Sequence, residues 1–372
     1  MIIKNGLVYT EHFTFEPMDV IIDNEIIART TTDPQIIDAE GLYVIPGLID
    51  THFHGCAGYD FCDGTIEAIE AMALFEAQNG ITAIAPATMT LGTEDLEHIF
   101  CCAAFYNRSP HPGAMLTGIH MEGPYLSEAK KGAQNAAYLR TPSVSHFRNM
   151  NALADGLIKV VTVAPEVNGA LEFIDQLKDE VAISIGHTAA DYQTARSAFA
   201  KGARHVTHLY NAMLPLSHRA PGPIGAALDN GSCKVELICD GIHIDPCMIR
   251  ASFRMFGDDR IILISDSMMA TGLTDGDYSL GGQAVNVKGN MAVLKDGTLA
   301  GSATHLMDCL RHAVSFGIPL TSALKCCTVN PAKELGIYNK AGSITPGKYA
   351  NLVLLDHNLN IKDVYIKGHK FL

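Results

Sequence analysis

Histidine and carboxylate side chains recur at one kind of position in this chain, at or just after the end of short apolar runs. The chain has eight such runs, and six of them end in residues that can bind a metal ion or exchange a proton. Imidazole nitrogens and carboxylate oxygens are typical ligands of Zn²⁺ in enzymes. The pattern therefore predicts a metal site with acid–base groups. The residues that make up the pattern are His52, His54, His120, Glu122, His187, His208, Asp240, His243 and Asp266.

The first pair has a spacing that suits one ion. Side chains at positions i and i+2 of a strand point to the same side, so His52 and His54 can face the same point. A lone buried histidine is more often a satisfied core residue than a ligand. Burying this many ionisable groups without a metal would be costly, however, so the joint site is favoured over coincidence. His120 is left out of the site, as either a supporting residue or part of the core.

The eight apolar runs alternate with helix-like stretches such as residues 65–80 and 191–202. Such runs are typical of strands buried on both faces, and the alternation indicates parallel βα units. Eight units predict an α/β fold of the (β/α)8 TIM-barrel type, whose active site lies at the carboxyl ends of the strands. The runs span residues 42–54, 81–88, 114–123, 158–166, 181–188, 205–213, 234–243 and 261–268.

Both chain ends have a different pattern of apolar and polar residues. Short runs that alternate apolar and polar residues, with Gly, Asn and Asp at the breaks, indicate antiparallel strands. We expect a small β-sandwich domain made from residues 1–45 and 341–372, with the barrel at residues 46–340 between its two parts. Residues 278–301 resemble a hairpin inserted after the eighth run.

Composition excludes several classes of function. The net charge is −13 without a block of Lys or Arg, which argues against nucleic acid as a partner. The sequence contains no apolar stretch of about 20 residues, so it predicts no membrane-spanning helix. The N-terminus does not resemble a signal peptide. The ten scattered cysteines contain no CxxC and are interpreted as reduced thiols, so we expect a cytoplasmic protein.

Longer motifs extend the interpretation. The chain resembles the amidohydrolase superfamily and, within it, the family of N-acetylglucosamine-6-phosphate deacetylases, over nearly its whole length. The segments that carry the resemblance include PGLIDTHFHG (46–55), GIHMEGPYLSEAKKGAQN (118–135), THLYNAMLPLSHRAPGPIG (207–225), DGIHIDP (240–246) and ISDSMMATGL (264–273). The resemblance implies hydrolysis of the N-acetyl group of N-acetylglucosamine 6-phosphate to glucosamine 6-phosphate and acetate.

The resemblance also implies a role for each matching residue. Glu122, His187 and His208 would hold the principal divalent metal, Zn²⁺ or Fe²⁺, and His52 and His54 a second ion present in some members. Asp266 would be the catalytic acid–base. The resemblance further implies a homodimer with the substrate site near its interface. The substrate-binding residues would be Ala133, Asn211, Ala212, Arg219 for the phosphate, His243, Leu299, Ala300 and Gly301.

Other interpretations remain open at this point. An amidohydrolase acting on a cyclic amide usually has a lysine ligand on the fourth strand, whereas Lys159 lies at the start of that run. A non-catalytic scaffold relative would tend to lose metal ligands, and a sugar-phosphate sensor would not need Asp266. The number of ions, the metal and the strictness for the sugar are left undecided by the sequence.

Overall fold

The computed structural model describes residues 1–372, and short parallel strands alternate with helices along the middle of the chain. Strands β6, β9, β11, β13 and β16 are buried at every residue, as expected for apolar runs covered on both faces. The parallel strands are β6 (Leu48–Asp50), β9 (Ile81–Ile84), β10 (Met115–Leu116), β11 (Ile119–Glu122), β12 (Ile158–Val163), β13 (Ala182–Ile185), β14 (His205–Val206), β15 (Lys234–Ile238) and β16 (Ile261–Ile264).

The helices begin where the sequence supplies capping side chains. Thr65 accepts a hydrogen bond from the backbone N–H of Ala68 at 3.1 Å, and Asp191 accepts one from Thr194 at 2.8 Å. The helices are α1 (Ile66–Gln78), α2 (Thr93–Tyr106), α3 (Val144–Leu153), α4 (Ala170–Leu177), α5 (Tyr192–Lys201), α6 (Gly222–Asp229), α7 (Pro246–Phe256), α8 (Leu306–Ser315), α9 (Leu320–Cys327) and α10 (Val329–Glu334). None of them is long and apolar enough to cross a bilayer.

The parallel strands form a curled sheet in two hydrogen-bonded sections. One section has the order β10-β9-β6 and the other runs from β11 to β16 in sequence order. The backbone N–H of His120 donates to the carbonyl of Pro86 at 3.0 Å, which links the two sections. After the last parallel strand, β16, the N–H of Asp266 donates to the carbonyl of His52, which follows β6, at 2.9 Å. The predicted α/β fold with parallel strands is thereby confirmed.

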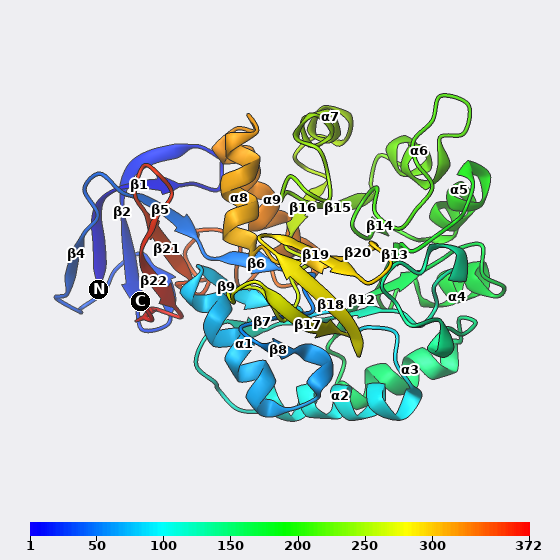
Figure 1. Cartoon of the computed structure of the whole chain (residues 1–372). Helices are drawn as coiled ribbons and strands as arrows, with labels where there is room; N and C mark the ends of the chain where they lie inside the picture. Colours follow the sequence, from blue (N-terminus) through cyan, green and yellow to red (C-terminus); the bar gives the residue numbers. More distant parts are fainter.

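The two chain ends meet in one mixed sheet, whose blue N-terminal and red C-terminal strands lie side by side in Figure 1. Its order is β23-β22-β21-β5-β1-β2-β3, with β4 beside β1. Ala350 and other residues of both ends share one apolar cluster. The strands are β1 (Ile2–Tyr9), β2 (Phe15–Asp23), β3 (Ile26–Ala28), β4 (Ile36–Asp38), β5 (Tyr43–Pro46), β21 (Leu352–Leu355), β22 (Ile361–Ile366) and β23 (His369–Lys370).

The insert after β16, the strand of the eighth apolar run, is larger than the single hairpin predicted. It is a four-stranded antiparallel sheet, made of β17 (Gly276–Leu280), β18 (Gln283–Lys288), β19 (Met291–Leu294) and β20 (Leu299–Ser302). The side chain of Gln283 donates a hydrogen bond to the carbonyl of Ala133, so the insert contacts the loop that follows β11. The remaining elements are β7 (Gly55–Cys56), β8 (Tyr59–Asp60) and three short 3₁₀ turns at Phe61–Asp63, Glu128–Lys130 and Ala136–Tyr138.

Candidate metal centre and active site

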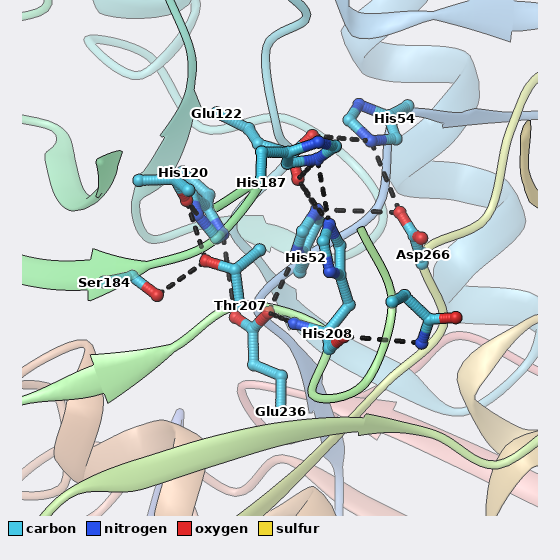
Figure 2. Close-up of polar contacts among 12 residues, drawn as sticks. His52, His54, His120, Glu122, Ser184, His187, Thr207, His208, Glu236 and Asp266 are labelled. Atoms are coloured by element: carbon cyan, nitrogen blue, oxygen red, sulfur yellow. Dashed lines mark hydrogen bonds and ion pairs between the residues drawn. The ribbon is translucent and has the colours of Figure 1, made fainter. Parts of the chain in front are cut away.

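The polar residues that follow the parallel strands converge at one place. His52 and His54 follow β6, Glu122 ends β11, and the others follow β13, β14 and β16. Figure 2 shows their side chains turned toward one another at the carboxyl ends of the strands. All six are buried, and the set is His52, His54, Glu122, His187, His208 and Asp266.

Glu122, His187 and His208 form the tightest group. The Nε2 atoms of the two histidines lie 3.0 Å apart, and they lie 3.2 Å and 3.0 Å from Oε1 of Glu122. Two ring nitrogens at this distance cannot both carry a proton without repulsion, but both can direct a lone pair at one cation. The geometry therefore matches three ligands of a single ion.

A second group adjoins the first through the same carboxylate. His54 Nε2 lies 3.3 Å from Oε2 of Glu122 and 3.3 Å from Oδ1 of Asp266. His52 Nε2 lies 3.5 Å from Oε1 of Glu122 and 3.6 Å from the same Asp266 oxygen. Glu122 thus turns its two oxygens toward different histidines, as a carboxylate between two ions would.

The chemistry of these residues fits a divalent cation. His52 Nε2 and Asp266 Oδ1 are buried and have no hydrogen-bond partner, an arrangement that is costly unless another group satisfies them. The donor set of imidazole nitrogens and carboxylate oxygens suits Zn²⁺ and other first-row divalent ions. These residues could therefore hold one ion or two.

The electrostatic field of the site favours positive charge. Burial lowers the pKa of His54, but its contacts with Asp266 and Glu122 outweigh burial and raise it to about 10. Burial raises the pKa of Asp266, yet the neighbouring His54 and His52 hold it below its usual value. Asp266 is therefore ionised at neutral pH and able to accept a proton.

The backbone is unusual at the same positions. His187, His208 and Asp266 have φ angles of 45°, 27° and 50°, and Ala212 has 49°. Non-glycine residues rarely adopt these left-handed conformations, which cost of order 1–3 kcal/mol and gather at functional sites. The fold thus holds the backbone of these residues in strained conformations at the candidate metal centre.

Two residues that sequence reasoning missed support the candidate ligands. Glu236, in the middle of β15, accepts from His52 Nδ1 at 2.8 Å and from the backbone N–H of His208 at 3.0 Å. Gln134 donates to Oε2 of Glu122 at 2.8 Å. A glutamate inside an otherwise apolar strand run was the available signal for Glu236, whereas only the motif 118–135 contained Gln134.

His120 lies in this supporting layer and not among the candidate ligands. Its Nε2 is 2.7 Å from the hydroxyl of Thr162, and its Nδ1 is 3.7 Å from Oε1 of Glu236. Burial, together with neighbouring His52, lowers the pKa of His120 to about 3, so the ring is neutral.

A cavity of about 260 Å³ opens onto the candidate ligands. The structure brings most of the predicted substrate-binding residues to it, namely Ala133, Asn211, Ala212, His243, Leu299 and Gly301, together with Thr298 and Leu280 of the insert. His243 is held by a 2.6 Å contact between its Nδ1 and Oδ2 of Asp240, which outweighs burial and raises the pKa of His243.

Two predicted residues lie away from this cavity. Ala300 is fully buried in the apolar cluster beneath the insert and does not line the cavity. Arg219 is exposed in the loop of residues 214–221, and it is not brought to the cavity within one chain.

Known proteins are similar to this chain along most of its length. The amidohydrolase family profile matches residues 43–370. The N-acetylglucosamine-6-phosphate deacetylase of Bacillus subtilis is 37% identical, with 99% of this chain and 96% of that protein covered. The N-acetylgalactosamine-6-phosphate deacetylase of Escherichia coli O157:H7 is 33% identical, with 94% and 93% covered.

Solved structures agree with the sequence relatives. A variant of the N-acetyl-D-glucosamine-6-phosphate deacetylase from Mycobacterium smegmatis, in complex with N-acetyl-D-glucosamine-6-phosphate, superimposes with a TM-score of 0.92 at 32% identity, covering 100% of this chain and 99% of that one. The Thermotoga maritima N-acetylglucosamine-6-phosphate deacetylase gives 0.91 at 31% identity, with 100% and 99% covered. The chain therefore belongs to the amidohydrolase family.

Proposed function

We propose that this protein hydrolyses the N-acetyl group of N-acetylglucosamine 6-phosphate, releasing acetate and glucosamine 6-phosphate. The observation that carries the proposal is the convergence of Glu122, His187 and His208 beside an ionised Asp266, at the floor of a cavity. Relatives named for that activity match the chain over nearly its full length.

The ligand assignment is part of the proposal. Glu122, His187 and His208 would hold the principal divalent ion, and His52 and His54 would hold the second ion where two are bound. Zn²⁺ and Fe²⁺ both suit this donor set. A bound ion supplies a Lewis acid that polarises a carbonyl and lowers the pKa of water.

The side chains of this chain then divide the proton transfers. Asp266 accepts a proton from the attacking water as it adds to the acetyl carbonyl carbon. His243, fixed by Asp240, donates a hydrogen bond to the oxygen on which negative charge develops. Asp266 returns its proton to the sugar nitrogen, because an amide nitrogen departs only when protonated.

Substrate recognition completes the assignment. Asn211, Ala212, Ala133, Leu299 and Gly301 contact the sugar from the wall of the cavity. Arg219 binds the 6-phosphate, since a guanidinium fork matches phosphate geometry. Because Arg219 lies outside the cavity of its own chain, we infer that it serves the site of a partner in a homodimer. The neighbouring Leu216 is 39% exposed, which supports an interface at this loop.

The finer architecture belongs to the same proposal. We infer that the parallel strands close into a (β/α)8 barrel within residues 46–340. The hydrogen bonds from His120 to Pro86 and from Asp266 to His52 support closure. We also infer a β-sandwich from residues 1–45 and 341–372, supported by hydrogen bonds between residues 25–27 and 348–350. All ten cysteines are free, which supports a reducing, cytoplasmic location.

N-acetylgalactosamine 6-phosphate is a second candidate substrate, because the Escherichia coli relative carries that activity in its name. The two sugars differ only in the orientation of one hydroxyl group. Acetate release should be measured on both sugar phosphates and on unphosphorylated N-acetylglucosamine, with the metal content determined on the same sample. The proposal predicts the highest kcat/KM for N-acetylglucosamine 6-phosphate, and turnover of none of the three would overturn it.

A further inference from the structure

A large cleft lies on the molecule away from the candidate active site. It has a volume of about 920 Å³, and none of its lining residues lines the active-site cavity. Its walls come from the loop after α2, the first residues of β10 and β12, the segment after α10, and the hairpin β22–β23. The starts of parallel strands face the opposite end of a curled sheet from the strand ends that carry the metal ligands.

The charge of this cleft is opposite to that of the whole protein. The chain has 40 acidic and 27 basic residues, yet the lining holds five of the basic residues and one of the acidic ones. They converge from separate segments of the chain. We call the region that they line the basic cleft, and its charged residues are Arg108, Lys159, Lys340, Lys367, Lys370 and Glu25.

Much of this positive charge is not neutralised by the protein. Lys370 Nζ lies 2.5 Å from Asp363, and Lys367 Nζ lies 3.7 Å from Glu25. Arg108, Lys159 and Lys340 form no ion pair, and Lys159 Nζ donates only to the carbonyl of Gly156, at 2.7 Å. Like charges gathered in a concave surface repel one another, and they raise the local concentration of anions.

Much of the remaining lining is apolar and includes aromatic rings, and the polar residues among it are Asn107, Ser109, His111, Thr117 and His369. Tyr106, Tyr349 and Phe371 line the cleft, and the ring of Tyr106 stacks on that of His111 with centroids 3.8 Å apart. Ligand sites commonly combine an apolar wall with a few charged groups that fix orientation, in volumes of about 300–1,000 Å³. A phosphate group alone would leave most of the apolar wall uncovered.

We propose that the basic cleft binds a phosphorylated metabolite that carries an aromatic ring, of which a nucleoside monophosphate is the simplest example. Arg108, Lys159 and Lys340 contact the phosphate, because a guanidinium group and ammonium groups pair with phosphate oxygens. The apolar wall covers the ring. This site is separate from the hydrolytic one, and the proposal does not depend on the substrate assigned above.

Calorimetric titration of the full-length, metal-loaded protein tests the proposal with three probes. AMP carries both groups, adenosine carries only the ring, and inorganic phosphate carries only the charge. AMP should bind with a stoichiometry of one per chain and at least about tenfold more tightly than either fragment. Equal affinity for AMP and adenosine, or for AMP and phosphate, would overturn the proposal.

Paired variants locate the binding. R108E/K340E should weaken AMP binding at least about tenfold, because both unpaired cations become repulsive. R196E/R254E changes the net charge equally at exposed arginines outside the cleft, and its affinity should stay within about twofold of the parent. Should the first variant fold poorly by circular dichroism, R108Q/K340Q removes the same charges without reversal. AMP binding that is unaffected by these cleft substitutions contradicts the assignment.

Discussion

The Nδ1 atom of His52 lies 2.8 Å from Oε2 of Glu236, so the two nitrogens of one ring face two different layers of the site. A ring that donates its Nδ1–H to a carboxylate presents the Nε2 lone pair to a metal. The same Glu236 oxygen accepts the backbone N–H of His208 at 3.0 Å. One buried side chain therefore orients a ligand of each proposed ion.

Replacing Glu236 by Gln tests this relationship. The amide keeps the volume, but its neutral oxygen is a weaker acceptor than the carboxylate oxygen that receives both the His52 Nδ1–H and the backbone N–H of His208. We expect metal affinity to fall about 10- to 100-fold, the usual effect of losing such a supporting partner. The ion at His52 and His54 should be affected most. Metal stoichiometry and calorimetric affinity measure this directly.

A matched control exists for that variant. Glu76 is also fully buried, but it makes no hydrogen bond or ion pair with the candidate ligands. E76Q should retain the metal content of the parent protein. Equal metal loss in E76Q and E236Q would show that burial of any carboxylate matters, and not the contact with His52.

Arg219 should act on the substrate phosphate. R219A is expected to lower kcat/KM for N-acetylglucosamine 6-phosphate about 10- to 100-fold, mainly through KM, because a charge-assisted hydrogen bond contributes about 1.5–3 kcal/mol. Activity on unphosphorylated N-acetylglucosamine should hardly change. An equal loss on both sugars would remove the phosphate role.

Mixing two impaired chains, assayed at a substrate concentration below KM, tests whether Arg219 serves the partner subunit. A heterodimer of R219A and D266N chains has one site with both defects and one intact site, provided that Arg219 acts across the interface. Co-expressed chains should then be more active than either homodimer. If Arg219 acts within its own chain, every site carries one defect, and the mixture gains nothing.

Removing metal should destabilise the fold. Without a cation, Glu122 faces several buried imidazole rings, such as those of His187 and His208. These rings must then either take up a proton or remain buried without a partner for their Nε2 lone pairs. Ion at a hundredfold excess over its Kd stabilises a protein by about 2.7 kcal/mol, so chelation should lower Tm by several degrees. E122Q provides the control, because its Tm should respond much less to the chelator. An unchanged Tm in the parent would contradict a tightly bound ion.

The sequence predicted the candidate ligands because they end buried strands. His52, Glu122 and Asp266 each follow an apolar run, and parallel strands bring their ends together. The chain ends were also predictable as strands, since alternation of side chains survives in a half-exposed sheet. The prediction that these strands are all antiparallel was wrong, because β1 pairs parallel with β4 and β5. The insert was predicted only as a hairpin, although Gly281–Gly282, Gly289–Asn290 and Asp296–Gly297 supply a turn signal at each of its three connections.

Other features depend on contacts that spacing does not encode. Glu236 is 184 residues from His52 in sequence, and Gln134 reaches Glu122 from a loop without regular structure. Arg219 was chosen from a motif, and its exposure depends on how the loop 214–221 folds. The basic cleft draws its cations from several segments, so no single stretch of sequence reveals it.

Asp266 offers the most direct test of the account. Its carboxylate is ionised and lies 3.3 Å from His54, and the Asn side chain has the same shape without a base. D266N should bind metal in the same ratio as the parent protein and lose about 10²–10⁴-fold in kcat for acetate release. A D266N protein that retains its metal and a near-normal kcat would contradict the proposed reaction.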